Sequence, residues 1–298
     1  MKILTIGNFG TGWDGSICDE EHIAKALEWQ GHEIIRVQRG EIPPVTVTKY
    51  DFILIAQWDG FEESYIEGLK LFGPLIYWAF DYQADGQEWH ERLVSQADLY
   101  LSKRIADSKY PNWQWFSQDF SPMFLNRHDQ KPERDIDVLF TGSYLPWATE
   151  RNETLKAVDN AFNLVIHSIT PDAWIEQGFK NVFGPVMDYD LSALIARAKI
   201  NISIDHMIEA GYWSDRNAQI MACGGLVLFR YIPLSEQVFK DKVVYFHNIP
   251  DCLEKIDWLL SDWGYRKMFG SQGYTFAQNN LLVSNKVKDL ITIVGGIL

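Results

Sequence analysis

Short apolar runs alternate with amphipathic stretches over most of the chain. Residues 2–6 form an apolar run that leads into a glycine-rich loop, and the next stretch places Ile23, Ala26 and Leu27 on one helical face. Runs of this kind are typical of buried parallel strands, with helices covering both faces of the sheet. We expect strands at 2–6, 33–37, 51–56, 74–79 and 99–101, and helices at about 19–30, 64–71 and 88–97. Ser16 or Asp19 is expected to cap the first helix.

A polar, proline-containing stretch at residues 107–135 interrupts this alternation and predicts a domain boundary. A second series follows it. We expect strands at 137–141, 164–167, 200–204, 226–229 and 243–246, helices at about 148–161, 192–198 and 216–223, and a closing helix at 283–294. The pattern therefore predicts an α/β protein with two Rossmann-like domains, residues 1–130 and 131–298.

The composition narrows the class of protein. The 298 residues carry a net charge of −13, with 47% hydrophobic and 22% charged residues, which is ordinary globular composition. So acidic a chain is not expected to bind phosphate backbones or anionic membranes over a broad surface. No apolar run is long enough for a membrane span, and the N-terminus does not resemble a signal peptide. Three widely spaced cysteines favour a reducing, cytoplasmic location.

The acidic excess is concentrated in the first half. Residues 1–135 have 13 basic and 22 acidic side chains, whereas residues 136–298 have 14 and 18. A site for an anionic ligand is therefore expected in the second half.

Two motifs match familiar patterns, but their context in the sequence does not support the functions that these patterns usually indicate. Gly10, Gly12 and Gly15 have the GxGxxG spacing of dinucleotide-binding loops, but they lie several residues beyond the strand end, and the second strand ends without an acid. We interpret this loop as a turn that approaches some other ligand closely. Asp188 and Asp190 form a DxD pair, yet 23 aspartates produce such pairs by chance. One of the two is expected to cap the following helix.

The most informative residues lie in the second half. The strand at 137–141 ends in Gly142 and Ser143, whose backbone amides would lie at the carboxyl edge of the sheet. Arg151 follows in the next helix. Arg216 opens a short helix, with Gln219 on the same face. Such an arrangement can bind a diphosphate through arginine and backbone amides, and a ribose through an amide side chain. The alternative is that Arg216 only pairs with a surface acid.

These residues resemble those of the two-domain GT-B glycosyltransferases, in particular the group-1, CgeB-like (spore-maturation-protein-like) branch. The resemblance covers most of the chain, and its most specific part is the segment from Arg216 to Phe229, which contains the sequence Ala-Cys-Gly-Gly. Other similar segments are residues 21–34, 75–81, 116–124, 137–143, 183–186 and 191–204. Gln219 departs from the family pattern, which has a glutamate at this position.

The resemblance implies two Rossmann-like domains facing a central cleft, with the C-terminal helix closing back towards the N-terminal domain. A nucleotide-diphospho-sugar, with a UDP-sugar favoured, would bind the C-terminal domain, and no metal or other cofactor is expected. Gly142, Ser143, Arg151 and Arg216 would hold the diphosphate, Gln219 the ribose, and Pro185 and Val186 the base. Gly211 is also assigned to the donor site.

The sequence says less about how the first half of the chain would bind an acceptor and activate its hydroxyl. Asp81 ends the fourth predicted strand, and Asp14 lies in the glycine-rich loop, so either is a candidate base for an acceptor hydroxyl if the reaction inverts the sugar. His22 and His90 are secondary candidates. Gly12, Trp13 and Trp58 are assigned to acceptor binding, because sugars stack on aromatic rings. Core packing is the alternative for the tryptophans.

We therefore expect a cytoplasmic glycosyltransferase (hexosyltransferase type) that acts on a small molecule, glycan or protein. One alternative is a phage-type glycosyltransferase of hydroxymethylpyrimidine bases in DNA, although the acidic first half argues against nucleic acid. The other is a non-catalytic nucleotide- or sugar-binding module.

Overall fold

The computed structural model describes residues 1–12, 16–38, 40–41, 49–56, 63–80, 87–117 and 134–297. The chain forms two units, Met1–Asp119 with Val283–Leu298, and Phe120–Leu282. Within the described residues, each unit contains one six-stranded parallel sheet, and the two sheets lie on opposite sides of residue 130 in the sequence. This is the predicted α/β class.

The first sheet has the strand order β2-β1-β3-β4-β5-β6. All of its strand pairs are parallel, and β1 pairs with both β2 and β3. Its elements are β1 (Lys2–Gly7), α1 (Asp19–Trp29), β2 (Glu33–Gln38), β3 (Phe52–Ala56), α2 (Glu63–Lys70), β4 (Leu75–Trp78), α3 (Glu88–Gln96), β5 (Leu99–Ser102), the 3₁₀ helix η1 (Ile105–Lys109) and β6 (Trp113–Trp115).

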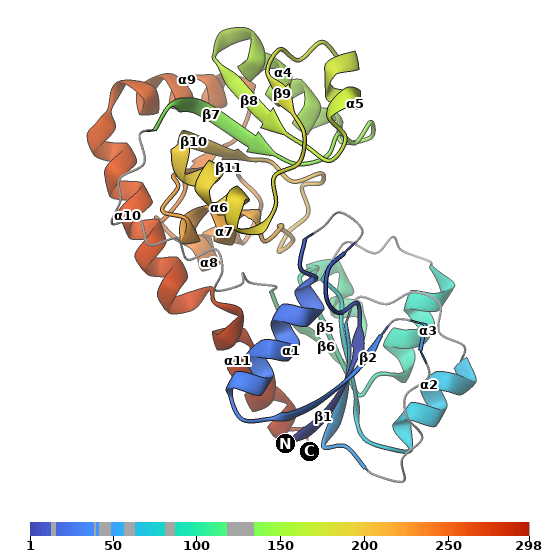
Figure 1. Ribbon diagram of the computed structural model, residues 1–298. Helices are drawn as coiled ribbons and strands as arrows, with labels where there is room; N and C mark the ends of the chain where they lie inside the picture. Colours follow the sequence, from blue (N-terminus) through green and yellow to red (C-terminus); the bar gives the residue numbers. More distant parts are fainter. Residues whose placement is uncertain are drawn as a thin grey trace. The chain divides into compact units, whose positions relative to one another are not determined.

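Helices cover both faces of this sheet (Figure 1). On one face, α1 and the C-terminal helix α11 (Val283–Gly295) lie side by side over alternate strand residues such as Ile76 and Leu101. Val287 and Leu290 of α11 are fully buried there, next to Ile23 of α1. On the other face, α2 and α3 cover the residues of opposite parity. The C-terminal helix therefore completes the first unit, as expected from the resemblance.

The second sheet has the order β12-β11-β10-β7-β8-β9, again with all pairs parallel. In chain order this is the doubly wound arrangement 6-5-4-1-2-3 of Rossmann folds. Its elements are β7 (Ile136–Thr141), α4 (Thr149–Ala161), β8 (Leu164–His167), α5 (Pro171–Glu176), β9 (Val182–Phe183), α6 (Asp188–Arg197), β10 (Ala198–Ser203), α7 (Arg216–Ala222), β11 (Val227–Arg230), α8 (Ser235–Phe239), β12 (Val244–Phe246), α9 (Ile249–Ser261) and α10 (Trp263–Asn280).

Alternation along β10 shows how the second sheet is buried. Ile200 and Ile202 point into the apolar cluster beneath α4, α5 and α9. Asn201 and Ser203 are also buried, but they belong to the opposite face. On the second unit's other helical layer, α10 packs closely on α7, since a Cβ at Gly273 would lie 3.1 Å from Met221.

Three local predictions were wrong. The stretch at 107–135 is not wholly a boundary, because it contains the end of η1 and the edge strand β6, which pairs with β5 and extends the first sheet. The sequence pattern of β6 is weak because the strand has only three residues. Asn112, just before β6, donates hydrogen bonds to backbone carbonyls within α3 and at its C-terminal end. Cys18 rather than Ser16 or Asp19 is the N-cap of α1, and Met187 rather than an aspartate is that of α6. In both helices the acids lie in the first turn, where they still favour the helix dipole.

Candidate functional site

The carboxyl ends of β7 and β10 mark the switch point of the second sheet. These strands are neighbours, but the chain continues from β7 towards β8 and β9, and from β10 towards β11 and β12. The loops leaving them therefore diverge, and open α/β sheets bind ligands between such loops. Gly142 and Ser143 follow β7, and Asp205 follows β10. The sequence pattern had placed the first two at this edge.

Arg216 joins the two strand ends. Its Nε donates to the carbonyl of Thr141 at 3.0 Å, and its Nη1 to that of Ile204 at 3.5 Å. Nη1 also lies 3.3 Å from Ser214 Oγ and 3.6 Å from Asp205 Oδ1. The side chain is 17% exposed, and its Nη2 makes no hydrogen bond within the described residues. Arg216 is thus held rigidly with one nitrogen left for a ligand, and it does not simply pair with a surface acid.

Gly142 lets the loop after β7 pass close to this guanidinium. A Cβ at this position would lie 3.1 Å from the Phe140 ring and 3.2 Å from Arg216 Nη2. The Gly142 N–H donates to the carbonyl of His167 at 3.0 Å, and its carbonyl accepts from the Trp174 indole at 3.1 Å. The peptide is therefore fixed on both sides, and a side chain would displace the arginine.

Arg151 also contacts the loop after β7. The side chain is buried in α4, and its Nη2 donates to the carbonyl of Ser143 at 2.8 Å. Burial, and secondarily repulsion from Arg216, lower the pKa of the Arg151 guanidinium to about 10, so it stays charged at neutral pH. Both guanidinium groups lie over the Phe140 ring, at 5.7 and 5.3 Å from its centroid. Arg151 therefore places a buried positive charge next to Ser143.

The arginine pair leaves positive charge at the switch point. Asp205 is 5% exposed, and its Oδ1 accepts from the backbone of Ser214 at 3.2 Å while facing Arg216. It supplies one negative charge against the two arginines. The Ser143 N–H has no hydrogen-bond partner in the described part of the chain. A free amide beside uncompensated guanidinium charge is an arrangement that binds an anion.

Gln219 lies on α7, one turn after the start of the helix, and is half-buried. Its Nε2 donates to the carboxylate of Asp215. An Asp215-bonded amide leaves the Gln219 carbonyl oxygen as a hydrogen-bond acceptor on the same helix that carries Arg216.

The other predicted donor residues occupy separate loops of the second unit. Pro185 is exposed and Val186 half-buried after the edge strand β9, so both lie at the carboxyl edge. Gly211 has a φ of +80°, a conformation that favours glycine, and its N–H donates to the carbonyl of Pro233 at 3.0 Å. It shapes the loop between β10 and α7.

The described part of the glycine-rich loop makes hydrogen bonds within the protein. Glu20 is 7% exposed, and its carboxylate accepts from the backbone N–H of Asn8 at 3.3 Å. The N–H of Gly12 donates to the carbonyl of Ser16 at 2.7 Å. A carboxylate beside the N-terminus of α1, where a dinucleotide would place its pyrophosphate, favours the interpretation that this loop is not a dinucleotide site.

Four predicted residues lie outside the described residues, namely Trp13, Asp14, Trp58 and Asp81. Of the secondary candidates, His22 is half-buried on α1. His90 is 2% exposed, with its two ring nitrogens 3.2 Å from Tyr77 Oη and 3.4 Å from Tyr100 Oη. Burial lowers the pKa of its imidazole. His90 is therefore a structural residue of the core and not an exposed base.

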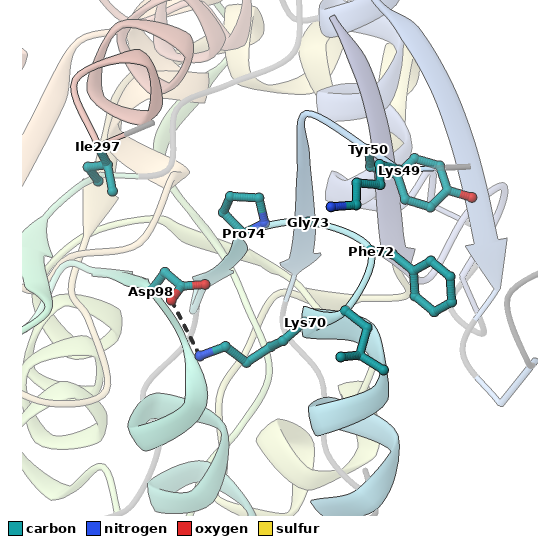
Figure 2. Close-up of a pocket in the computed structure, with 9 residues that line it drawn as sticks. Lys49, Tyr50, Lys70, Phe72, Gly73, Pro74, Asp98 and Ile297 are labelled. Carbon is teal, nitrogen blue, oxygen red and sulfur yellow. Dashed lines mark ion pairs between the residues drawn. The ribbon is translucent and has the colours of Figure 1, made fainter. Parts of the chain in front are cut away.

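A cavity of about 490 Å³ opens at the amino edge of the first sheet, opposite to the carboxyl ends of its strands (Figure 2). Its lining comes from the segments that precede β3, β4 and β5, including Tyr50, Pro74 and Asp98. Lys70 pairs with Asp98 at 3.3 Å across it. Because this is the amino edge of the strands, the cavity does not lie where open α/β sheets hold their substrates.

Sequence reasoning missed Asp205 and Ser214. A single acid after an apolar strand is a common strand-end residue, and its value here depends on Arg216 reaching across from α7. The available signal was positional, since Asp205 directly follows the run 200–204 that predicts a central strand.

Replacing Gly142 with alanine is expected to destabilise the second unit by about 1–3 kcal/mol, because the new Cβ overlaps the Phe140 ring and Arg216. Urea unfolding measures this change. Gly184→Ala is the matched control, since a Cβ there meets nothing within 4 Å, and it is expected to change stability by less than about 0.5 kcal/mol. Equal unfolding free energies for the two variants would contradict the close approach at Gly142.

No helix in the described segments has both the length and the apolar character needed to cross a membrane.

Known proteins resemble this chain in sequence over one region and in fold over its whole length. Residues 148–292 match the family model described as "Glycosyl transferase-like". This region contains Arg151, Arg216, Gln219 and the α7 segment, so it includes most of the side chains described above at the switch point. No curated protein sequence matches the chain.

Three solved structures illustrate the likeness in fold. Sucrose-phosphate synthase from Thermosynechococcus elongatus has 10% identity and a TM-score of 0.67, with 100% of both chains covered. HepE from Anabaena, in complex with UDP and glucose, has 11% identity and a TM-score of 0.67, with 99% of each chain covered. An alpha-glucosyltransferase in complex with UDP-glucose and DNA containing an abasic site has 11% identity and a TM-score of 0.69, with 99% of each chain covered. The two parallel sheets have the GT-B fold.

Proposed function

We propose that this glycosyltransferase of GT-B fold moves a sugar from a nucleotide-diphospho-sugar, with a UDP-sugar favoured, to a hydroxyl-bearing acceptor. The observation that carries the proposal is Arg216 at the switch point, fixed on Thr141 and Ile204 with Nη2 open to a ligand. UDP-bound and UDP-glucose-bound proteins among the similar folds support a nucleotide donor. The CgeB-like branch, a cytoplasmic location and an acceptor that is a small molecule, glycan or protein are parts of the same proposal.

The arrangement suits the departure of a nucleoside diphosphate. As the bond between the sugar carbon and the phosphate oxygen breaks, negative charge grows on the diphosphate. Arg216 and the Ser143 N–H are preorganised to stabilise this charge, and buried Arg151 adds its field. The proposal therefore assigns charge stabilisation to side chains and amides and includes no metal. Pro185 and Val186 would contact the base, and Gln219 the ribose.

The acceptor hydroxyl must lose a proton during transfer. We keep Asp81 and Asp14 as candidate bases for an inverting reaction, and Gly12, Trp13 and Trp58 as acceptor-binding residues. If the reaction retains the sugar configuration, the leaving phosphate can take the proton, and neither carboxylate is required.

A nucleotide series tests the donor site. UDP at about 100 times its dissociation constant is expected to stabilise the protein by about 2.7 kcal/mol, because it binds the folded state alone. Uridine at the same concentration is expected to give little stabilisation, since it lacks the charge that compensates Arg151 and Arg216. Thermal unfolding in the presence of uridine, UMP and UDP measures the difference, with inorganic diphosphate as the control for charge without base.

Turnover is tested with UDP-, GDP-, dTDP- and ADP-sugars by release of the nucleoside diphosphate. Release from at least one donor supports the enzyme and argues against a non-catalytic binding module, the alternative that Gln219 suggests. The proposal would be contradicted if no member of the series gave either nucleoside diphosphate release or thermal stabilisation.

A second candidate acceptor is a hydroxymethylpyrimidine base in DNA. An alpha-glucosyltransferase bound to UDP and DNA containing an HMU base is among the similar folds, with 12% identity and a TM-score of 0.69. The excess of 22 acids over 13 bases in residues 1–135 argues against DNA at the acceptor half. Sugar transfer to duplexes with and without hydroxymethylated bases separates this candidate from the others.

A further inference from the structure

Trp147 is exposed beside the anion site. It lies in the loop between β7 and α4, four residues after Ser143, and is 61% exposed. Its ring is perpendicular to that of His206, with centroids 5.1 Å apart and planes at 86°. His206 in turn contacts the ring of Tyr212 at 5.6 Å. The indole therefore has a ring contact within the protein while much of its surface is open to solvent.

These rings connect the two loops of the switch point. Trp147 belongs to the loop after β7, whereas His206 directly follows Asp205, after β10. Arg216 contacts the last carbonyls of the same two segments, at Thr141 and Ile204. The exposed indole and the guanidinium are thus held by the same pair of loops.

The place of the diphosphate indicates which part of a donor would reach this indole. On the proposed function, the diphosphate lies at Gly142 and Ser143 after β7, beside Arg216. A nucleotide-sugar continues from its diphosphate into the sugar, so the sugar lies next to these residues. Trp147 belongs to the same loop as Ser143, and its exposed ring contacts His206 of the loop after β10.

We propose that Trp147 is the platform on which the donor's sugar ring stacks, a role that rests on the proposed function. The face of a pyranose presents polarised C–H groups, and an indole face carries negative quadrupole charge that attracts them. The contact with His206 holds the indole in place and reduces the ordering cost on binding. Trp147 is therefore a specificity residue that distinguishes a nucleotide-sugar from the nucleotide alone.

Calorimetric binding of UDP and UDP-glucose to Trp147→Ala tests this role. The variant is expected to bind UDP-glucose about three- to tenfold more weakly than the wild type, while UDP affinity is unchanged. Trp147→Phe is expected to recover part of the loss, because it keeps an aromatic face. The matched control is Trp263→Ala, a similarly exposed tryptophan on α10, which is 63% exposed and carries Lys267 over its ring. It should bind both ligands like the wild type.

The outcomes separate the platform from the donor site itself. If UDP binds and Trp147→Ala weakens UDP and UDP-glucose equally, or neither, the platform is overturned and the proposed function stands. If the wild type binds none of the UDP-, GDP-, dTDP- and ADP-sugars, the proposed function is overturned and the platform with it. Because Trp147 is exposed, the unliganded melting temperature of Trp147→Ala is expected to match the wild type, which excludes misfolding as the cause of a selective loss.

Discussion

Arg216→Ala is expected to lower kcat/KM for sugar transfer by about 10²–10³. On the proposed function, the side chain stabilises charge that develops on the departing diphosphate, and removing one preorganised donor of this kind costs about 2.7–4 kcal/mol of transition-state stabilisation. The loss is expected mainly in kcat, because the charge is greater in the transition state than in the bound donor. Steady-state kinetics with the best donor measure both parameters.

Arg216→Lys is expected to recover only a minor part of this activity. Lysine keeps the charge, but it lacks the planar fork that contacts Thr141 and Ile204 while leaving Nη2 open. Arg197→Ala is the control, because Arg197 is half exposed at the end of α6 and pairs with Asp135 away from the switch point. Near-wild-type turnover of Arg216→Ala, with the donor still binding, would remove Arg216 from the proposed chemistry.

Much of the fold follows from the apolar pattern because its strands are buried on both sides. Every residue of the run 52–56 is buried, and such a short continuous apolar run is typical of a strand in a parallel sheet. The edge strands β6 and β9 were not predicted, since they have three and two residues and are partly exposed. The short helices α5 and α8 were missed as well. Their formation depends on tertiary packing, as with fully buried Trp174, and not on a periodic pattern.

The candidate site could be predicted where it depends on strand ends. Gly142 and Arg216 are 74 residues apart in sequence, yet parallel strands bring their surroundings to one edge. The sequence pattern could not predict how deeply each of these side chains is buried. Arg151 was expected to neutralise the diphosphate, but the pattern did not show that its guanidinium is buried against Ser143 and Phe140. The Asp205 contact was equally hidden, because it requires the path of the loop before α7.

Asp205→Asn is expected to affect stability and nucleotide binding in opposite directions. Asparagine keeps an acceptor for the Ser214 N–H but removes the negative charge that faces Arg216. Two guanidinium groups then share the Phe140 ring without this carboxylate, so the unliganded second unit should lose about 2 kcal/mol. This loss is smaller than the value of about 3–5 kcal/mol for a fully buried pair, because Arg216 is 17% exposed. The melting temperature should fall by about 4–8 °C.

The same change should strengthen the response to UDP. An anion now relieves more uncompensated charge, so the UDP-induced rise in melting temperature is expected to exceed that of the wild type. Asp137→Asn is the matched control, since Asp137 pairs with Lys199 across the same two strands at 2.6 Å but is one-third exposed. It should cost less than about 1 kcal/mol and leave the UDP response unchanged.

The pH dependence of UDP binding gives an independent check on the Asp205 charge. The pKa of Arg151 is lowered from 12.5 to about 10, and Asp205 opposes this shift. Because the anion requires the charged form, wild-type affinity should fall as pH rises through about 10. In Asp205→Asn, the opposing charge is gone, so the fall should begin at lower pH. Identical pH profiles, together with an unchanged UDP response, would show that Asp205 does not set the charge of this site.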